Sequence, residues 1–183
     1  MKLITTLTAV SLMAVSALFA GTEMSKMDDS KGLSQSIMEQ DIPLFRANEW
    51  SVDAFGTYVF TDTSGRYRDG FGGGAGVNYF FTRYIGVGFD GYAWQGAQND
   101  DAVGAIAGNL ILRLPIDKYH FAPYIFAGPG GIFGPINEFS GQAGAGVEVR
   151  ITHNFGIFAD ARYVFTTESN DYILPRAGVR FIF

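Results

Sequence analysis

The chain has 183 residues and a formal net charge of -5, and it contains 24 Gly, 17 Phe and 9 Tyr but no cysteine. This length suits one domain, and the lack of cysteine excludes disulfides, thiolate chemistry, cysteine-based zinc sites and lipid attachment to an N-terminal cysteine. The acidic balance without a basic stripe excludes nucleic acid as a partner. Abundant glycine and aromatic residues together favour strands over helices.

The first 47 residues form two segments. Residues 1–20 begin with a positive charge at Lys2, continue as an apolar and small-residue run and end at Ala20. This is the pattern of a secretory signal peptide, and cleavage after Ala17 is the alternative to cleavage after Ala20. Residues 21–47 are polar and rich in Met and Ser, so we expect a flexible N-terminal segment there.

From residue 48 onward, short alternating segments are separated by turn residues. Eight strands are predicted, at residues 49–60, 70–81, 85–94, 103–114, 119–128, 141–151, 155–165 and 173–183. Their connections alternate between short turns and longer loops, and the longest loop is expected at 129–140. Such alternation is typical of a barrel in lipid, because only a closed sheet satisfies every backbone group in hydrocarbon. Residues 48–183 are therefore predicted to form an all-β, eight-stranded antiparallel up-and-down transmembrane β-barrel.

Charged residues collect on the strand face that is rich in small residues. In 141–151 one face holds Ala, Val and Ile from Ala143 to Ile151, while the other holds Gln142, Gly144, Gly146, Glu148 and Arg150. A small barrel needs a filled interior, so we expect this face to point inward and to pair its charges, with glycines such as Gly144 making room for them. The alternative interpretation is that these charges lie on the water-facing surface of a sheet. The predicted lumen charge network comprises Asp53, Asp90, Arg113, Glu148, Arg150, Asp160, Arg162, Arg176 and Arg180.

Aromatic residues on the opposite, apolar face are banded by depth, as expected of the two girdles of a bilayer-spanning barrel. The band near the short turns comprises Trp50, Tyr79, Phe81, Phe121, Phe155, Phe181 and Phe183. The band near the loops comprises Tyr58, Phe60, Phe71, Tyr163 and Phe165.

The end of the chain, residues 176–183, resembles the C-terminal assembly signal of bacterial outer-membrane proteins through Arg176, Gly178, Phe181 and Phe183. With the leader and the eight strands, residues 48–183 resemble the small eight-stranded outer-membrane barrels that include the OmpA transmembrane domain and OmpX. This resemblance implies a monomer in the Gram-negative cell outer membrane, surrounded by its lipid, with both termini in the periplasm. It also implies periplasmic chaperones in transit and recognition of the last strand by the barrel-assembly machinery.

The favoured function is a non-enzymatic outer-membrane barrel with a side-chain-filled lumen and a structural or surface-interaction role, without cofactor or metal. The alternatives are a lipid-modifying barrel enzyme, a small pore and a soluble lipocalin-like binder. Such an enzyme needs a His, a Ser and an acid at one rim. Ser140 and Glu138 fall in the predicted long loop, whereas His120 and His153 fall near the short turns, which counts against hydrolysis.

Overall fold

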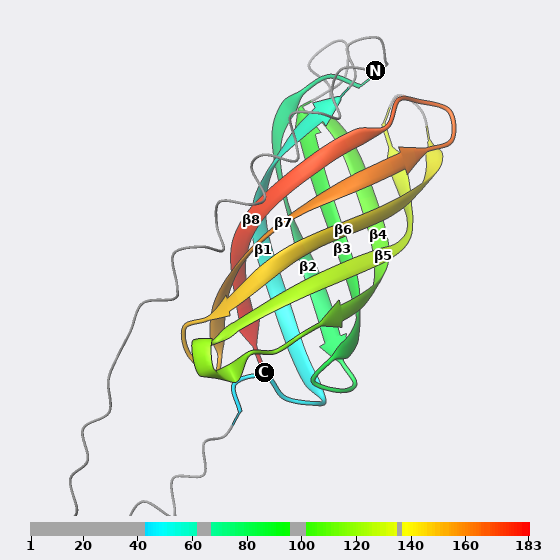
Figure 1. Ribbon diagram of the computed structural model, residues 1–183. Helices are drawn as coiled ribbons and strands as arrows, with labels where there is room; N and C mark the ends of the chain where they lie inside the picture. The colour runs from blue at the N-terminus through cyan, green and yellow to red at the C-terminus, as the bar shows by residue number, and fades with distance from the viewer. Residues whose placement is uncertain (1–42, 62–66, 96–101, 135–136) are drawn as a thin grey trace, which may run out of the picture. The chain divides into compact units, whose positions relative to one another are not determined.

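The computed structural model describes residues 43–61, 67–95, 102–134 and 137–183, so the predicted leader and nearly all of the N-terminal segment lie outside the described residues. The described chain forms a closed barrel whose strands are neighbours in chain order (Figure 1). The strands are β1 (Glu49–Thr61), β2 (Gly70–Phe80), β3 (Ile85–Gln95), β4 (Ala102–Arg113), β5 (Phe121–Phe133), β6 (Glu138–Arg150), β7 (Phe155–Thr166) and β8 (Tyr172–Ile182). All of them pair antiparallel, which confirms the predicted fold.

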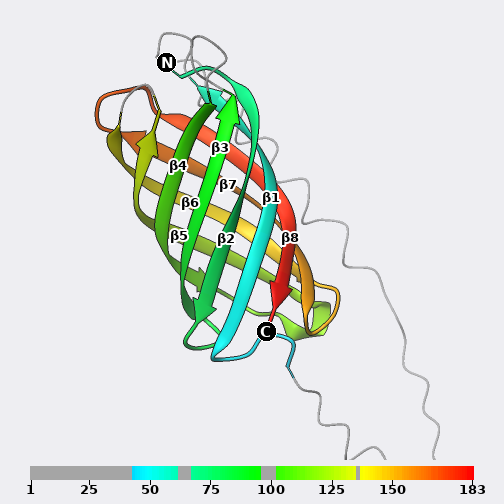
Figure 2. The ribbon, with the colours of Figure 1, turned by 180° about the vertical axis from the view of Figure 1, so that it is seen from behind.

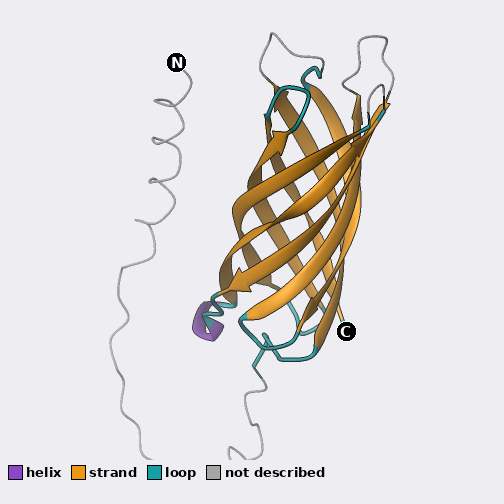
Figure 3. Cartoon of the chain, turned by 90° about the vertical axis from the view of Figure 1, so that its right-hand side faces the viewer, coloured by secondary structure: helices purple, strands orange, loops and turns teal. Residues whose placement is uncertain are grey.

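The barrel closes by pairing β1 with β8 (Figure 2). The backbone N–H of Phe183 donates to Trp50 O at 2.9 Å, so the start of β1 and the end of the chain lie together. We call this the terminus end of the barrel and the opposite end the distal end. A short 3-10 helix, η1 (Asp117–Tyr119), lies at the terminus end between β4 and β5 (Figure 3). Within the described ranges, no helix is long and apolar enough to cross a membrane.

Side chains alternate between the two faces of the sheet, as the period of two in the sequence predicts. Along β1, Ser51, Asp53 and Phe55 are buried inside the barrel, whereas Val52 and Ala54 are exposed on its outer surface. The buried face is the one that carries the charges, and the exposed face is apolar. The barrel therefore keeps its charged side chains inside and an apolar surface outside, the reverse of a soluble sheet with one solvated face.

The prediction of a long loop at 129–140 is wrong. The strand β5 continues to Phe133 and β6 begins at Glu138, so only residues 134–137 connect them. The glycines and prolines there indicated a loop, but Pro129 is accommodated inside a strand. Conversely, the connection 114–120 is longer than predicted because it contains η1. Turn length consequently differs less between the two ends of the barrel than the sequence indicated.

Two prolines interrupt the hydrogen-bond ladder, because proline has no N–H to donate. The pairing of β4 with β5 stops between Ala107 and Leu110, opposite Pro129, and resumes in the same register. The pairing of β1 with β8 stops between Thr57 and Phe60, opposite Pro175. At this second gap the Thr57 hydroxyl donates to Pro175 O at 2.8 Å, so a side chain bridges the strands where the amide is missing.

Candidate functional site

The barrel lumen is filled by a network of buried charges. All nine residues predicted for it are buried in the interior. Sequence reasoning missed one member, Glu49, which is 1% exposed. The period of two in the sequence could have identified it, because Glu49 shares the strand face of Ser51 and Asp53. With Glu49 the network balances its arginines, Arg113, Arg150, Arg162, Arg176 and Arg180, against the acids Glu49, Asp53, Asp90, Glu148 and Asp160.

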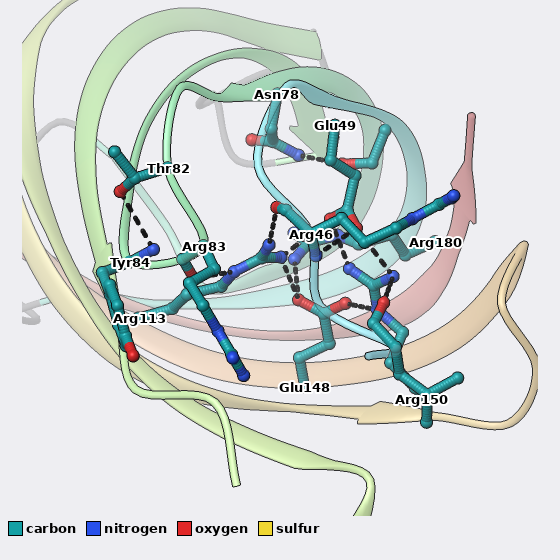
Figure 4. Close-up of polar contacts among 12 residues, drawn as sticks. Arg46, Glu49, Asn78, Thr82, Arg83, Tyr84, Arg113, Glu148, Arg150 and Arg180 are labelled. Carbon is teal, nitrogen blue, oxygen red and sulfur yellow. Dashed lines mark hydrogen bonds and ion pairs between the residues drawn. The ribbon is translucent and has the colours of Figure 1, made fainter. Parts of the chain in front are cut away.

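At the terminus end, two carboxylates bridge three arginines (Figure 4). Glu49 Oε1 accepts from Arg113 Nη1 at 2.9 Å and from Arg150 Nη2 at 2.6 Å. Glu148 accepts from Arg150 Nε, and its other oxygen accepts from Arg180 Nη1 at 2.6 Å. Arg180 also donates from Nε and Nη2 to the two oxygens of Asp53, each at 2.7 Å. The pairs connect β1, β4, β6 and β8 across the interior.

A second group of pairs fills the middle of the lumen. Arg162 donates to both oxygens of Asp90 at 3.0 and 3.1 Å, and Arg176 Nε donates to Asp160 at 2.6 Å. Four neutral polar side chains that the sequence prediction omitted complete the hydrogen bonds of three acids and of Arg162. Asn78 donates to Asp53, Asn109 donates to Asp90, and the Tyr124 hydroxyl donates to Asp160 at 2.6 Å. Gln142 accepts a hydrogen bond from Arg162.

Aromatic rings lie against the guanidinium groups along the lumen. The Arg176 guanidinium lies 4.7 Å from the ring centroid of Phe55, and that of Arg162 lies 5.1 Å from Phe126. Gly144 makes room for this ring, because a Cβ there would lie 2.5 Å from Phe126 Cζ. The predicted reason for the inward glycines is therefore wrong at Gly144, where an aromatic ring and not an arginine fills the space, but at Gly156 the neighbouring side chain is that of Arg150, as predicted.

The distal end of the lumen is closed mainly by aromatic side chains. Trp94 contacts the rings of Tyr67, Tyr92 and Tyr172, with centroid separations of 5.5 to 5.9 Å. The Tyr67 hydroxyl donates to Glu138, whose other oxygen accepts from the backbone N–H groups of residues 168 and 169. Buried Glu138 thus fastens the connection between β7 and β8. Sequence reasoning missed this role because it placed Glu138 in a loop.

A buried ion pair is costly unless both partners keep their hydrogen bonds, and removing one partner costs about 3–5 kcal/mol. In this lumen each arginine of the network lies against at least one carboxylate. The arrangement therefore holds the walls of the barrel together electrostatically. Among the described residues, no group of three or more His, Asp or Glu side chains could hold a metal ion.

The residues considered for a lipid-modifying enzyme do not come together in the structure. Ser140 and Glu138 lie on β6 near the distal end, which corrects their predicted place in a loop. His120 follows η1, and His153 lies in the turn before β7, both at the terminus end. The separation of the histidines from the serine, which the sequence predicted, is present in the structure.

The residues of the predicted assembly signal divide between the two faces of β8. Arg176 and Arg180 point into the lumen, whereas Phe181 and Phe183 are 47% and 70% exposed on the outside. Other outward aromatic residues cluster at both ends of the barrel. Trp50, Tyr79 and Phe81 contact one another in series at the terminus end, and Tyr58, Phe60 and Phe71 do so at the distal end.

No family model matches the chain, and no curated protein matches it in sequence. Among solved structures, the N-terminal β-barrel domain of Pseudomonas aeruginosa OprF matches with a TM-score of 0.61 and 18% identity, over 75% of this chain and 99% of that one. Neisserial surface protein A matches with a TM-score of 0.55 and 15% identity, over 73% and 95%. Ail, the attachment invasion locus protein of Yersinia pestis, matches with a TM-score of 0.52 and 18% identity, over 75% and 99%. The chain thus has the fold of the small eight-stranded outer-membrane β-barrels, as the sequence predicted.

Proposed function

We propose that this protein is an integral outer-membrane β-barrel with a side-chain-filled lumen, which acts as a monomer in a structural or surface-interaction role without catalysis. The observation that carries the proposal is the distribution of side chains: apolar residues cover the outside, and the charges are paired inside. An exposed apolar surface that encircles a barrel needs an apolar surrounding, and lipid supplies it.

The height of the apolar belt supports a membrane location. On β1 the outward aromatic residues Trp50 and Phe60 mark its two ends. They are about ten residues apart, and a rise of ~3.3 Å per residue at a tilt of ~40° gives roughly 25 Å. This is the height of the apolar band of known outer-membrane barrels. Other strands also carry apolar side chains on the outer face, where Leu110, Leu112, Ile125, Val147 and Ile157 are all exposed.

Orientation and assembly belong to the same proposal. The terminus end would face the periplasm, and the N-terminal segment would lie on that side as well. Phe181 and Phe183 protrude from the outer surface of the final strand, where assembly machinery and periplasmic chaperones could bind them before the strand meets lipid. No arrangement of Ser140, Glu138 and the two histidines favours the enzymatic alternative, since these groups lie at opposite ends of the barrel.

The absence of native cysteine allows a direct test. A spin label would be attached at Leu112→Cys, on the outward face of β4, and separately at Lys118→Cys in η1. In lipid vesicles, the label at residue 112 should be accessible to oxygen and protected from a water-soluble nickel complex, and the label at residue 118 should show the reverse. Equal access of the nickel complex to both labels, or recovery of the native protein in the soluble periplasm without detergent, would refute the proposal.

A further inference from the structure

The residues immediately before β1 enter the terminus end of the barrel and occupy it. Phe45 is 0% exposed, although residues 43–48 belong to no strand. Nothing in the sequence pattern predicts this, because Phe45 lies in the polar N-terminal segment.

This segment contacts the two arginines at the mouth of the lumen. The ring centroid of Phe45 lies 5.1 Å from the Arg113 guanidinium and 4.7 Å from that of Arg150. Arg150 Nη1 donates to Leu44 O at 3.1 Å, and Arg113 Nη2 donates to Arg46 O at 3.2 Å. The carbonyl groups of Leu44 and Arg46 and the ring of Phe45 therefore all lie against these two cations.

Glu49 connects this segment to the lumen. Its carboxylate accepts from both arginines and also from the backbone N–H of Arg46, at 3.3 Å. Between them, Asn48 has φ of 55°, and its side chain accepts from the Tyr79 hydroxyl at 3.0 Å. This left-handed residue turns the chain from the sheet back into the mouth.

We propose that residues 43–46 form a stopper that seals the terminus end of the lumen and can leave it without breaking the barrel. The stopper contributes no pair to the sheet, so its departure leaves every strand pairing intact. Its departure would, however, expose Glu49, Arg113 and Arg150 to water and remove the acceptors at Leu44 and Arg46. The stopper thus keeps water out of the terminus half of the lumen. The inference does not depend on a membrane location.

Single cysteines in the cysteine-free chain test this by their reaction with a membrane-impermeant thiol reagent. Ser51→Cys places a thiol on the lumen face of β1, two residues after Glu49. Val103→Cys places a thiol at the distal end. Both native residues are 0% exposed. In the protein folded in detergent, Phe45→Ala should speed labelling at residue 51 by about tenfold or more and leave labelling at residue 103 unchanged. Folding of each variant is verified by its heat-dependent mobility on cold gels.

Leu44→Ala is the matched control, because it shortens a neighbouring side chain but keeps the carbonyl that Arg150 uses. It should leave labelling at residue 51 slow. In a second arm, a chain starting at Ala47 should label quickly at residue 51, and a synthetic peptide of residues 43–48 added in excess should slow that labelling. Equal labelling at residue 51 with and without Phe45, or equal acceleration at residues 51 and 103, would overturn the proposal.

Discussion

Asp53 on β1 and Arg180 on β8 face each other across the strand pair that closes the barrel. They are direct register partners, and Arg180 donates two hydrogen bonds of 2.7 Å to the carboxylate. The backbone ladder alone would permit β8 to shift along β1. A shift by one residue would turn Arg180 toward the outside and leave Asp53 unpaired within the lumen. The ion pair therefore selects the register in which the barrel closes.

Replacement of Asp53 by Asn should remove this selection while keeping the shape of the side chain. We expect the free energy of unfolding in lipid vesicles to fall by about 3 kcal/mol, since Arg180 loses its paired charge in a dry interior. Urea titration followed by tryptophan fluorescence measures this. Arg83→Gln, which breaks a partly exposed pair with Asp117, should cost at most about 1 kcal/mol. A loss for Asp53→Asn no larger than that of the control would contradict the assigned role.

Two glycines of β6 provide a matched pair. Gly144→Ala should lower the free energy of unfolding by about 1–3 kcal/mol, because the added Cβ would lie 2.5 Å from Phe126 Cζ and 2.6 Å from Ala161 O. Gly141→Ala has nothing within 4 Å of its Cβ, so we expect a change within about 0.5 kcal/mol. The same urea titration compares the two variants. Equal effects would show that the lumen is not packed as tightly as described.

Replacement of Phe183 by Ala, which keeps the backbone hydrogen bonds between residue 183 and Trp50, should impair membrane insertion in cells more than refolding in detergent. The ring is 70% exposed, so it adds little to packing within the barrel. Its proposed role lies in recognition by the assembly machinery. The measurements are the amount of folded protein in outer-membrane fractions and the heat-dependent gel shift after refolding. Phe165→Ala, which removes an outward aromatic residue at the distal end, is the control. Normal insertion of the Phe183→Ala variant would argue against the signal.

In planar lipid bilayers the wild-type protein should show no large, stable conductance. Paired charges fill the middle of the lumen, and Phe45 and Trp94 are buried near its two ends. Eight strands leave an interior just wide enough for side chains. Frequent openings of constant, large conductance would mean that these contacts break readily and would revive the pore alternative.

The strands and the lumen charges could be predicted from sequence because both depend on a period of two along the chain. Asp53 shares its strand face with Ser51 and Thr57, Arg180 shares its face with Arg176 and Gly178, and that local pattern was sufficient. Pro129 was misplaced because its residue type is common in loops, whereas its position opposite a gap in the ladder depends on the neighbouring strand. Phe45 could not be found, since its burial depends on Arg113 and Arg150, which lie on β4 and β6 far along the chain.

The two proline gaps have a mechanical consequence. One lies between β4 and β5 and the other between β8 and β1. In a barrel of eight strands in sequential order these seams are four strands apart, on opposite walls. Each seam lacks ladder contacts at its gap and should bend there more easily than the other seams. We therefore expect the cross-section to flatten along one preferred direction, so that thermal motion makes the barrel oval about a fixed axis.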